Sequence, residues 1–162
     1  MKRAPSNRLW AADDAGFTLI EMLVVVLIIG ILAAIAIPQF LGQKSKSQDA
    51  AAKELVRTAQ TTAETYQIDH GGNYEGLSTA VLKSYEPSIQ TVAAGNPAYL
   101  SVAEPIEGNL GFTVTTKAID GHTFTITHKA SGVIERICEA VGAKEPTKAT
   151  GSEGGGCQNG SW

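Results

Sequence analysis

The longest run of apolar positions lies near the N-terminus, from Phe17 to Ile37. As an α-helix its 21 residues would be about 31 Å long, which matches the hydrocarbon core of a bilayer. A cleaved secretory signal has a shorter apolar core that ends in a small-residue cleavage site. Here the run continues through Pro38 into residues 39–41. We therefore predict a transmembrane helix over 17–38 that stays with the protein.

After Pro38 the apolar positions take the spacing of an amphipathic helix. They recur every three or four residues and so form one stripe: Ala52, Leu55, Val56, Ala59, Ala63 and Tyr66. The pair Gly71-Gly72 favours a helix end. We predict a single helix from about 18 to 69, with 39–70 as its amphipathic second half. At roughly 78 Å this helix would be too long for a small domain to cover, so its first half would be buried in lipid or in other helices.

Residues 71–109 are punctuated by glycine and proline, which predicts a connecting region rich in loops. Within it, Ser78 has the residue type of a helix N-cap, and a short helix is expected over Thr79–Tyr85. A short strand is expected over Tyr99–Val102.

The last region, 110–162, begins with an alternation of apolar and polar residues. Three segments show the period of half-buried strands: Leu110–Ala118, His122–Lys129 and Val133–Glu139. Asp120-Gly121 is a strong hairpin signal, and Ala130-Ser131-Gly132 is a second turn. The strand faces to be buried carry Phe112, Val114 and Thr116 on one segment, and Phe124, Ile126 and His128 on the next. We predict an α+β fold in which a sheet of three or four antiparallel strands packs on the apolar stripe of the helix.

One charge interrupts the apolar run. Glu21 would cost roughly 2.5–3.5 kcal/mol at a bilayer centre, and less near a helix end, where its side chain could reach the headgroups. It could close a capping box, with Thr18 as N-cap and Glu21 three residues later. It could also pair with a cation. This stretch supplies none itself, but the α-amino group at the N-terminus of a neighbouring chain could supply one. The residues leave these three interpretations open, and they are compatible with one another.

Composition narrows the chemistry. The net charge of −3 argues against broad affinity for nucleic acid, which needs a basic surface. His122 and His128 would share a strand face, but no third ligand has suitable spacing, so no metal site is predicted. Glu104 and Glu107 flank Pro105 and are expected in a solvated loop. No phosphate-binding loop, nucleophile elbow or cofactor motif is found, so we expect neither a cofactor nor an enzyme.

The segment Gly16-Phe17-Thr18-Leu19-Ile20-Glu21, followed by the apolar run with Gly30 and Pro38, resembles the class III signal of type IV pilins and type II secretion pseudopilins. The resemblance covers about 23 of the 162 residues. It implies that residues 1–16 are a leader, which a prepilin peptidase removes between Gly16 and Phe17 before methylating the Phe17 amine. It also implies that Glu21 pairs with the N-terminal amine of an adjacent subunit. The leader ends Asp13-Asp14-Ala15, where many leaders of this family are basic.

The same resemblance implies the pilin fold, a single-pass inner-membrane precursor with a cytoplasmic N-terminus, and an extracellular filament after assembly. The expected partners are copies of the chain, other pilins, the peptidase and methylase, an inner-membrane assembly platform and an assembly ATPase. Removal of the leader, which carries a net charge of +1, would leave a chain with a net charge of −3 − (+1) = −4.

Many type IV pilins close a C-terminal loop with a disulfide, and Cys138 and Cys157 stand in similar positions. An even cysteine count in an exported domain favours that bridge over two free thiols. Major pseudopilins commonly have an acidic calcium-binding loop and no disulfide, so a pilin is favoured over a pseudopilin. A membrane-anchored exported enzyme or binding protein that uses the same signal is the remaining alternative. We also expect Gly30 and Pro38 to weaken the helix, so that segment 30–38 could lose helix in a filament.

Overall fold

A computed structural model describes residues 16–140, 157 and 160–162. The longest element is helix α1, Leu19–Asp69, which contains Pro38. The chain divides into two compact units, residues 1–39 and 40–162, which are described in turn.

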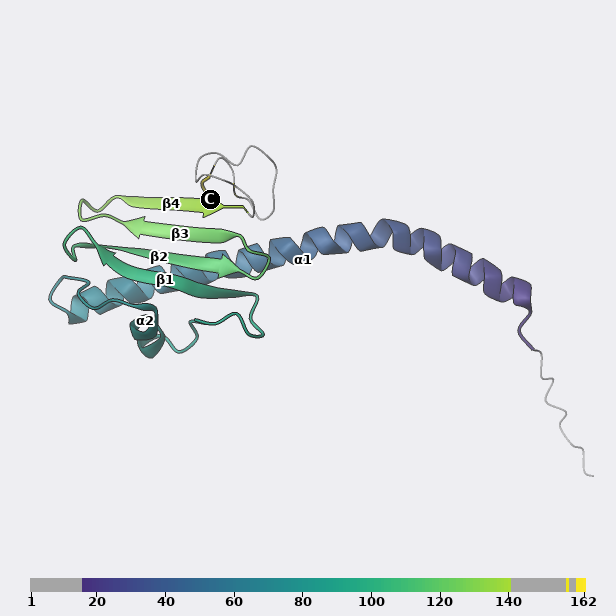
Figure 1. Cartoon of the computed structure of the whole chain (residues 1–162), viewed down its shortest axis with the longest axis horizontal. Helices are drawn as coiled ribbons and strands as arrows, with labels where there is room; N and C mark the ends of the chain where they lie inside the picture. Colours follow the sequence, from purple (N-terminus) through teal and green to yellow (C-terminus); the bar gives the residue numbers. More distant parts are fainter. Residues whose placement is uncertain (1–15, 141–156, 158–159) are drawn as a thin grey trace, which may run out of the picture. The chain divides into compact units, whose positions relative to one another are not determined.

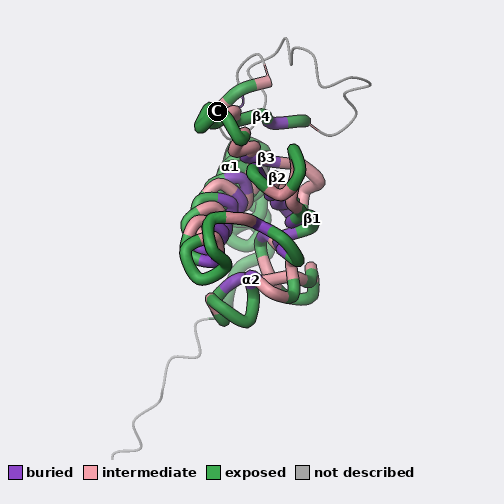
Figure 2. The backbone as a smooth tube through the Cα atoms, turned by 90° about the vertical axis from the view of Figure 1, so that its left-hand side faces the viewer, coloured by how far each residue is buried: buried purple, intermediate pink, exposed green. Residues whose placement is uncertain are grey.

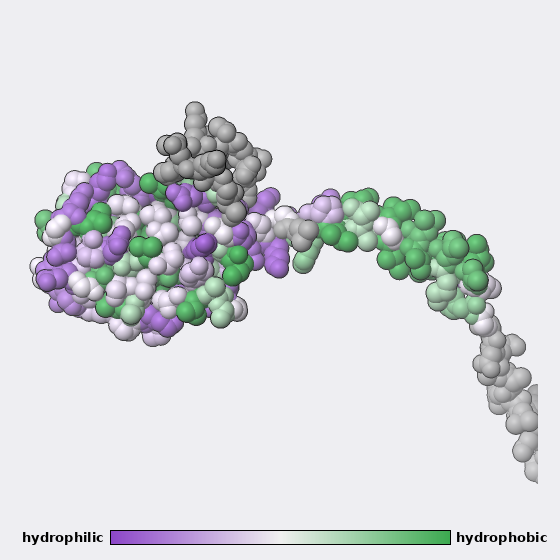
Figure 3. Space-filling view, viewed as in Figure 1, coloured by the Kyte–Doolittle hydropathy of each residue, from purple (hydrophilic) through white to green (hydrophobic). Residues whose placement is uncertain are grey.

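In the first unit the described residues form the apolar beginning of α1. This part of the helix is long and apolar enough to cross a membrane, and Figure 3 shows hydrophobic side chains over its surface. Its large apolar side chains are exposed, between 45% at Val24 and 82% at Leu19. The helix is unbroken at Gly30 and Pro38. The prediction of one helix through the apolar run and the amphipathic stripe is therefore confirmed.

The second unit holds the rest of α1, the short helix α2 and a four-stranded sheet (Figure 1). Helix α2 covers Thr79–Tyr85, and Ser78 caps it by accepting a hydrogen bond of 3.3 Å from the backbone N–H of Val81. The strands are β1 Ala98–Ile106, β2 Gly111–Ala118, β3 Thr123–His128 and β4 Ile134–Glu139. They form an antiparallel meander in the order β1-β2-β3-β4. This is the α+β fold that the residue pattern predicts, and it has the pilin-like arrangement that the resemblance implies.

The core lies between the second half of α1 and one face of the sheet, and Figure 2 shows buried positions on both. The helix contributes the predicted stripe, except that Leu55 is only partly buried. The sheet contributes Phe112, Val114 and Thr116 from β2 with Phe124 and Ile126 from β3, all no more than 1% exposed. The alternation of apolar and polar residues therefore placed these two strands on the correct face.

Both predicted turns are present, and each has a glycine with positive φ. Gly121 (φ 103°) donates to the carbonyl of Ala118 over 2.9 Å, and Gly132 (φ 82°) closes the turn between β3 and β4. Helix α1 ends before Gly71 and Gly72, which also have positive φ. Glycine adopts this left-handed conformation without the steric cost that other residues carry.

Strand β1 is longer than the sequence predicts, so the assignment of Glu104 and Pro105 to a loop was wrong. Pro105 pairs with Phe112, and Glu104 pairs with Thr113. Proline lacks the N–H that a central strand must donate, but β1 is an edge strand and tolerates it. The register shifts between Leu100 and Val102, which marks a β-bulge. Proline and a bulge together hid this strand from a search for regular alternation.

Candidate functional site: the start of α1 and the polar contacts of the domain

The start of α1 is a complete capping box. The backbone N–H of Thr18 donates to Oε2 of Glu21 over 3.0 Å, and the Thr18 hydroxyl donates to the same oxygen over 2.8 Å. The backbone N–H of Glu21 donates to the Thr18 hydroxyl over 3.3 Å. Two backbone donors at the helix end are thereby satisfied reciprocally. The capping interpretation of Glu21 is confirmed in the isolated chain.

The capping box leaves the charge of Glu21 without a counter-charge on its own helix. Both partners that Thr18 offers are neutral hydrogen-bond donors. The first cationic residue after Glu21 is Lys44, more than six helical turns further on. A groove of about 370 Å³ lies beside the carboxylate and is lined by Phe17, Ile20, Glu21, Val24 and Val25. Among the residues that the structure describes, the site therefore combines a carboxylate that has no cationic partner with an apolar groove.

Gly30 and Pro38 lie further along the same helix, and neither interrupts it. A Cβ added at Gly30 would meet no atom within 4 Å, so packing within this chain does not require glycine there. Proline has no N–H for the carbonyl one turn earlier, which leaves one helical hydrogen bond unmade.

Cys138 of β4 and Cys157 form a disulfide, with their Cα atoms 5.9 Å apart. The pairing that the resemblance implied is confirmed, and both cysteines are buried. Most of the loop that it closes, residues 141–156, lies outside the described residues. The backbone N–H of Cys138 also donates to the carbonyl of Gly160 over 2.9 Å. The bridge and this hydrogen bond hold the C-terminal residues against the sheet.

Trp162 was not identified from the sequence as part of the domain. Its indole N–H donates to the carbonyl of Ile137 over 3.1 Å, and its ring meets Phe124 edge-on at 5.8 Å between centroids. Three cationic side chains lie 5.3 to 5.9 Å from the ring centre: Lys53, Arg57 and Arg136. Cations over an indole face are attracted by its quadrupole. Periodic spacing of apolar residues indicates helices and strands, but a single residue that follows a loop has no such period. The sequence therefore did not indicate this contact.

Two tyrosines hold the end of α1 against the segment that follows it. The Tyr74 hydroxyl donates to Oε1 of Gln67 over 3.0 Å, and the Tyr66 hydroxyl donates to the carbonyl of Glu75. Both rings are buried. Burial raises the pKa of Tyr74, and the negative charge of Glu64 adds to that shift.

His122 and His128 do not come together, but His122 has other neighbours. Its Nδ1 lies 2.9 Å from Oδ1 of Asp49 and 3.5 Å from Oδ2 of Asp120. His128 instead stacks on Phe112, with ring centroids 5.5 Å apart. Burial raises the pKa of Asp49, and the hydrogen bond from His122 opposes that shift. Sequence spacing missed this group because Asp49 is more than 70 residues away from its partners.

Comparisons with known proteins agree with the family resemblance of the segment that begins α1. A family model described as the prokaryotic N-terminal methylation motif matches residues 12–37. The chain is 35% identical to Fimbrial protein Q of Moraxella bovis over 129 residues, which cover 73% of this chain and 82% of that protein. The chain belongs to the type IV pilin family. It is also 34% identical to the type IV wide pilus major component PilA4 of Thermus thermophilus, over 62% of this chain and 80% of that protein.

This pilin has pseudopilin relatives as well, with lower coverage. It is 30% identical to the Type II secretion system core protein G of Pectobacterium carotovorum, over 51% of this chain and 53% of that protein. No solved structure matches the chain. The pilin is a structural subunit of a type IV pilus, made as a membrane-anchored precursor and found in a surface filament. Its relatives are structural pilins and pseudopilins rather than enzymes.

Proposed function

We propose that this pilin polymerises through the first half of α1, with Glu21 setting the axial register of each subunit. In this mechanism the leader, residues 1–16, is removed between Gly16 and Phe17 on the cytoplasmic side. The new Phe17 amine is then methylated. The Phe17 amine of one subunit lies against Glu21 of its neighbour. This amine is the cation that pairs with the Glu21 carboxylate. A prepilin peptidase and methylase, an inner-membrane platform and an assembly ATPase are the partners that these steps require.

The observation that supports this mechanism is the uncompensated charge of Glu21. Its only hydrogen-bond donors within the described residues come from neutral Thr18. Burying an unpaired carboxylate among apolar helices costs several kcal/mol, whereas a paired and hydrogen-bonded one is tolerated. Pairing with an amine on another chain would therefore both offset this cost and fix where the two helices sit along their common axis.

The driving force would be burial of the exposed apolar side chains on 17–40. Each large apolar side chain that leaves water or lipid for a packed helix bundle gains contacts with its neighbours. We also propose that segment 30–38 loses helix during assembly, because Pro38 already leaves one backbone hydrogen bond unmade. In the isolated chain this segment is helical. A filament structure with an unbroken helix through Pro38 would refute this part of the proposal.

The decisive experiment separates the charge of Glu21 from its capping role. Glu21→Gln keeps an oxygen that can accept the hydrogen bonds of Thr18 but removes the charge. Thr18→Ala removes the hydroxyl of the capping box and keeps the charge. Each variant is scored for leader removal, for amount in the membrane and for yield of sheared surface filaments.

We expect Glu21→Gln to be processed normally and to form no filaments, whereas Thr18→Ala forms filaments in reduced or normal amounts. Normal filaments from Glu21→Gln would refute the register mechanism. Mass spectrometry of the sheared wild-type filaments should find methylated Phe17 at the N-terminus. An unmethylated or unprocessed N-terminus in those filaments would refute the proposed processing.

The pilin function is favoured over secretion by the disulfide and by the greater coverage of the fimbrial relatives. A pseudopilin would support secretion of other exported proteins instead. Deletion of the gene with measurement of both surface filaments and exported protein distinguishes the two roles, because each role predicts loss of a different product.

A further inference from the structure

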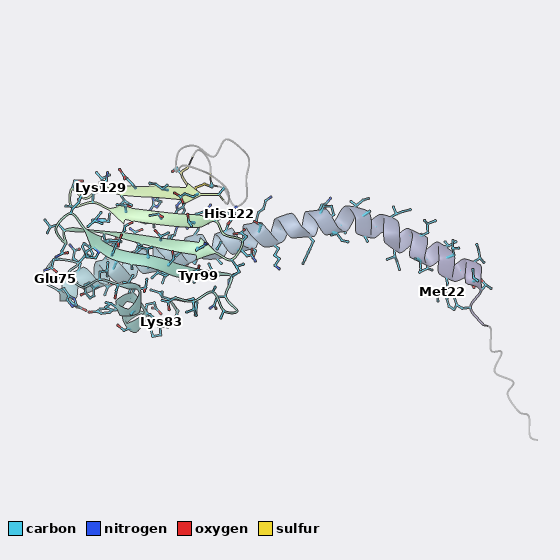
Figure 4. The ribbon with its side chains drawn as sticks, viewed as in Figure 1. Met22, Glu75, Lys83, Tyr99, His122 and Lys129 are labelled. Carbon is cyan, nitrogen blue, oxygen red and sulfur yellow. A yellow bond between two sulfur atoms is a disulfide. The ribbon has the colours of Figure 1, made fainter. Side chains whose placement is uncertain are left out.

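The strongest unassigned feature of the domain is a cluster of polar side chains between α1 and the turn that joins β2 to β3. Figure 4 labels His122 at this turn. Asp49 comes from α1, Asp120 from the turn and His122 from the residue before β3. One ligand atom from each of the three lies within 4.8 Å of the others. This grouping is unrelated to the helix start and to the proposed assembly mechanism.

An orphaned buried oxygen indicates that the cluster is incomplete. Asp49 is 0% exposed, its Oδ1 is bonded to His122, and none of the residues that the structure describes forms a hydrogen bond to its Oδ2. A buried carboxylate oxygen without a partner carries the full cost of its lost hydration. Lys53, one turn further along α1, attracts this carboxylate, but it does not bond to Oδ2. A ligand that binds anionic oxygen would satisfy this atom.

We propose that Asp49, Asp120 and His122 form a binding site for a divalent transition-metal ion, and that this ion is Zn²⁺. The donor set is one imidazole nitrogen and two carboxylates, which suits Zn²⁺ better than Ca²⁺ or Mg²⁺, since these two prefer oxygen ligands alone. Two carboxylates would also neutralise the charge of one divalent ion.

Two of the three distances between ligand atoms fit this assignment. Tetrahedral zinc has ligands at 2.0–2.2 Å, which places neighbouring ligand atoms about 3.3 Å apart. The Nδ1 of His122 lies 2.9 Å from Oδ1 of Asp49 and 3.5 Å from Oδ2 of Asp120, so these two separations bracket that value. The three ligand atoms all lie within 4.8 Å of one another. Binding of the metal would replace the proton that the His122–Asp49 hydrogen bond now shares, and this proton would leave to solvent.

The outer contacts of the cluster already orient its partly exposed carboxylate, Asp120. The hydroxyl of Ser45 donates to Oδ2 of Asp120 over 2.6 Å, and the backbone N–H of His122 donates to Oδ1 of Asp120 over 3.3 Å. Such second partners hold metal ligands in place. A groove of about 350 Å³, lined by Ser45 and Asp120 among others, borders the cluster on the side of Asp120. A bound ion would cross-link α1 to the β2–β3 turn.

Zinc binding is tested on the full chain in detergent, after chelator treatment, by titration with Zn²⁺. Parallel titrations use Ca²⁺ and Mg²⁺. We expect one saturable Zn²⁺ site per chain, a rise in the thermal midpoint that chelator reverses, and no saturable site for the other two ions. The absence of a saturable Zn²⁺ site, or preferential binding of Ca²⁺, would overturn the assignment.

Single substitutions test which side chains bind the metal ion. Asp120→Asn and His122→Gln each remove a ligand at a partly exposed position, so their folding is checked first by circular dichroism without metal. Ser45→Ala should weaken Zn²⁺ binding by roughly tenfold to a hundredfold, the usual cost of an outer partner, and each ligand variant should weaken it more. His70→Gln, in the turn that follows α1, is the matched control and should bind as the wild type does. Equal affinity in Asp120→Asn, His122→Gln and the wild type would refute the site.

Discussion

The hydroxyl of Thr116 donates a hydrogen bond of 2.8 Å to the backbone carbonyl of Ala52, and thereby joins the middle of β2 to α1. Both residues are 0% exposed. The hydroxyl also lies 3.4 Å from the carbonyl of Phe124 on the adjacent strand. A polar group in an otherwise apolar layer is tolerated because it is paired. It also fixes one position of the helix along the sheet, which apolar contacts alone define less sharply.

Thr116→Val tests the value of this contact. Valine has nearly the same shape as threonine, so the main loss is one buried hydrogen bond. The free energy of unfolding should therefore fall by about 0.5–1.5 kcal/mol. Urea unfolding of the full chain in mild detergent measures the difference. The matched control is Thr125→Val, whose hydroxyl is paired with Thr115 over 2.9 Å at a partly exposed site where water can replace it. Equal effects of the two substitutions would contradict the role given to Thr116.

Gly111 at the start of β2 lies where a side chain cannot fit. A Cβ there would be 2.5 Å from the backbone carbonyl oxygen of His128 and 3.2 Å from the backbone nitrogen of Ala130. Backbone atoms cannot swing away as a flexible side chain can. Gly111→Ala should therefore lower the free energy of unfolding by roughly 1–3 kcal/mol, the usual cost of overpacking.

Gly42→Ala is the matched control for this substitution. Gly42 lies in α1, and a Cβ there would meet nothing within 4 Å. Alanine favours helix over glycine by up to about 1 kcal/mol, so this variant should be as stable as the wild type or more stable. The same glycine-to-alanine change is thus expected to lower the free energy of unfolding at Gly111 and to leave it unchanged or raise it at Gly42. If Gly111→Ala were neutral in urea unfolding, the close approach of β2 to the β3–β4 turn would be wrong.

The disulfide between Cys138 and Cys157 should contribute about 3 kcal/mol, because it closes a loop with a sequence separation of 19. The double variant Cys138→Ser, Cys157→Ser should unfold at a correspondingly lower urea concentration. Reductant should bring the wild type to the same midpoint and leave the double variant unchanged. A wild-type midpoint that reductant does not move would show that the bridge adds no stability.

The sequence predicted the elements whose pattern repeats. Alternation identified β2 and β3, and three- and four-residue spacing identified the stripe on α1. Strand β1 escaped in part, because Pro105 and the bulge near Leu100 break the alternation that a search uses. An edge strand accepts both irregularities, since one of its sides pairs with no neighbour. Which strand lies at an edge depends on the whole sheet and is not visible in a local pattern.

The helix stripe did contain a signal for the polar cluster. Asp49 stands three residues before Ala52 and continues the same three- and four-residue spacing. A charged residue on the buried face of a helix needs a partner, and the chain had to fold before Asp120 and His122 could supply one. Glu21 is the opposite case. Its capping partner Thr18 lies three residues away and could be predicted from the local sequence, whereas its proposed second partner belongs to another chain.

Tyr74 should make the pilin sensitive to alkali. Its ring is 0% exposed, and burial, with the charge of Glu64, raises its pKa above the ordinary value near 10. Below pH 10 the phenol is neutral in both states, so its contribution to stability is fully present. Above about pH 10 the unfolded chain releases the proton while the folded chain retains it, and stability falls as pH rises towards the raised pKa.

Tyr74→Phe isolates this effect. Near neutral pH the variant loses the hydrogen bond to Gln67 and should be about 1 kcal/mol less stable than the wild type. At about pH 11 the gap in unfolding free energy should narrow or reverse, because phenylalanine has no proton to lose. Gln67→Ala is the control: it removes the same hydrogen bond but keeps the phenol, so it should lose stability with alkali as the wild type does. A gap between wild type and Tyr74→Phe that is constant from pH 8 to pH 11 in urea unfolding would contradict the raised pKa of Tyr74.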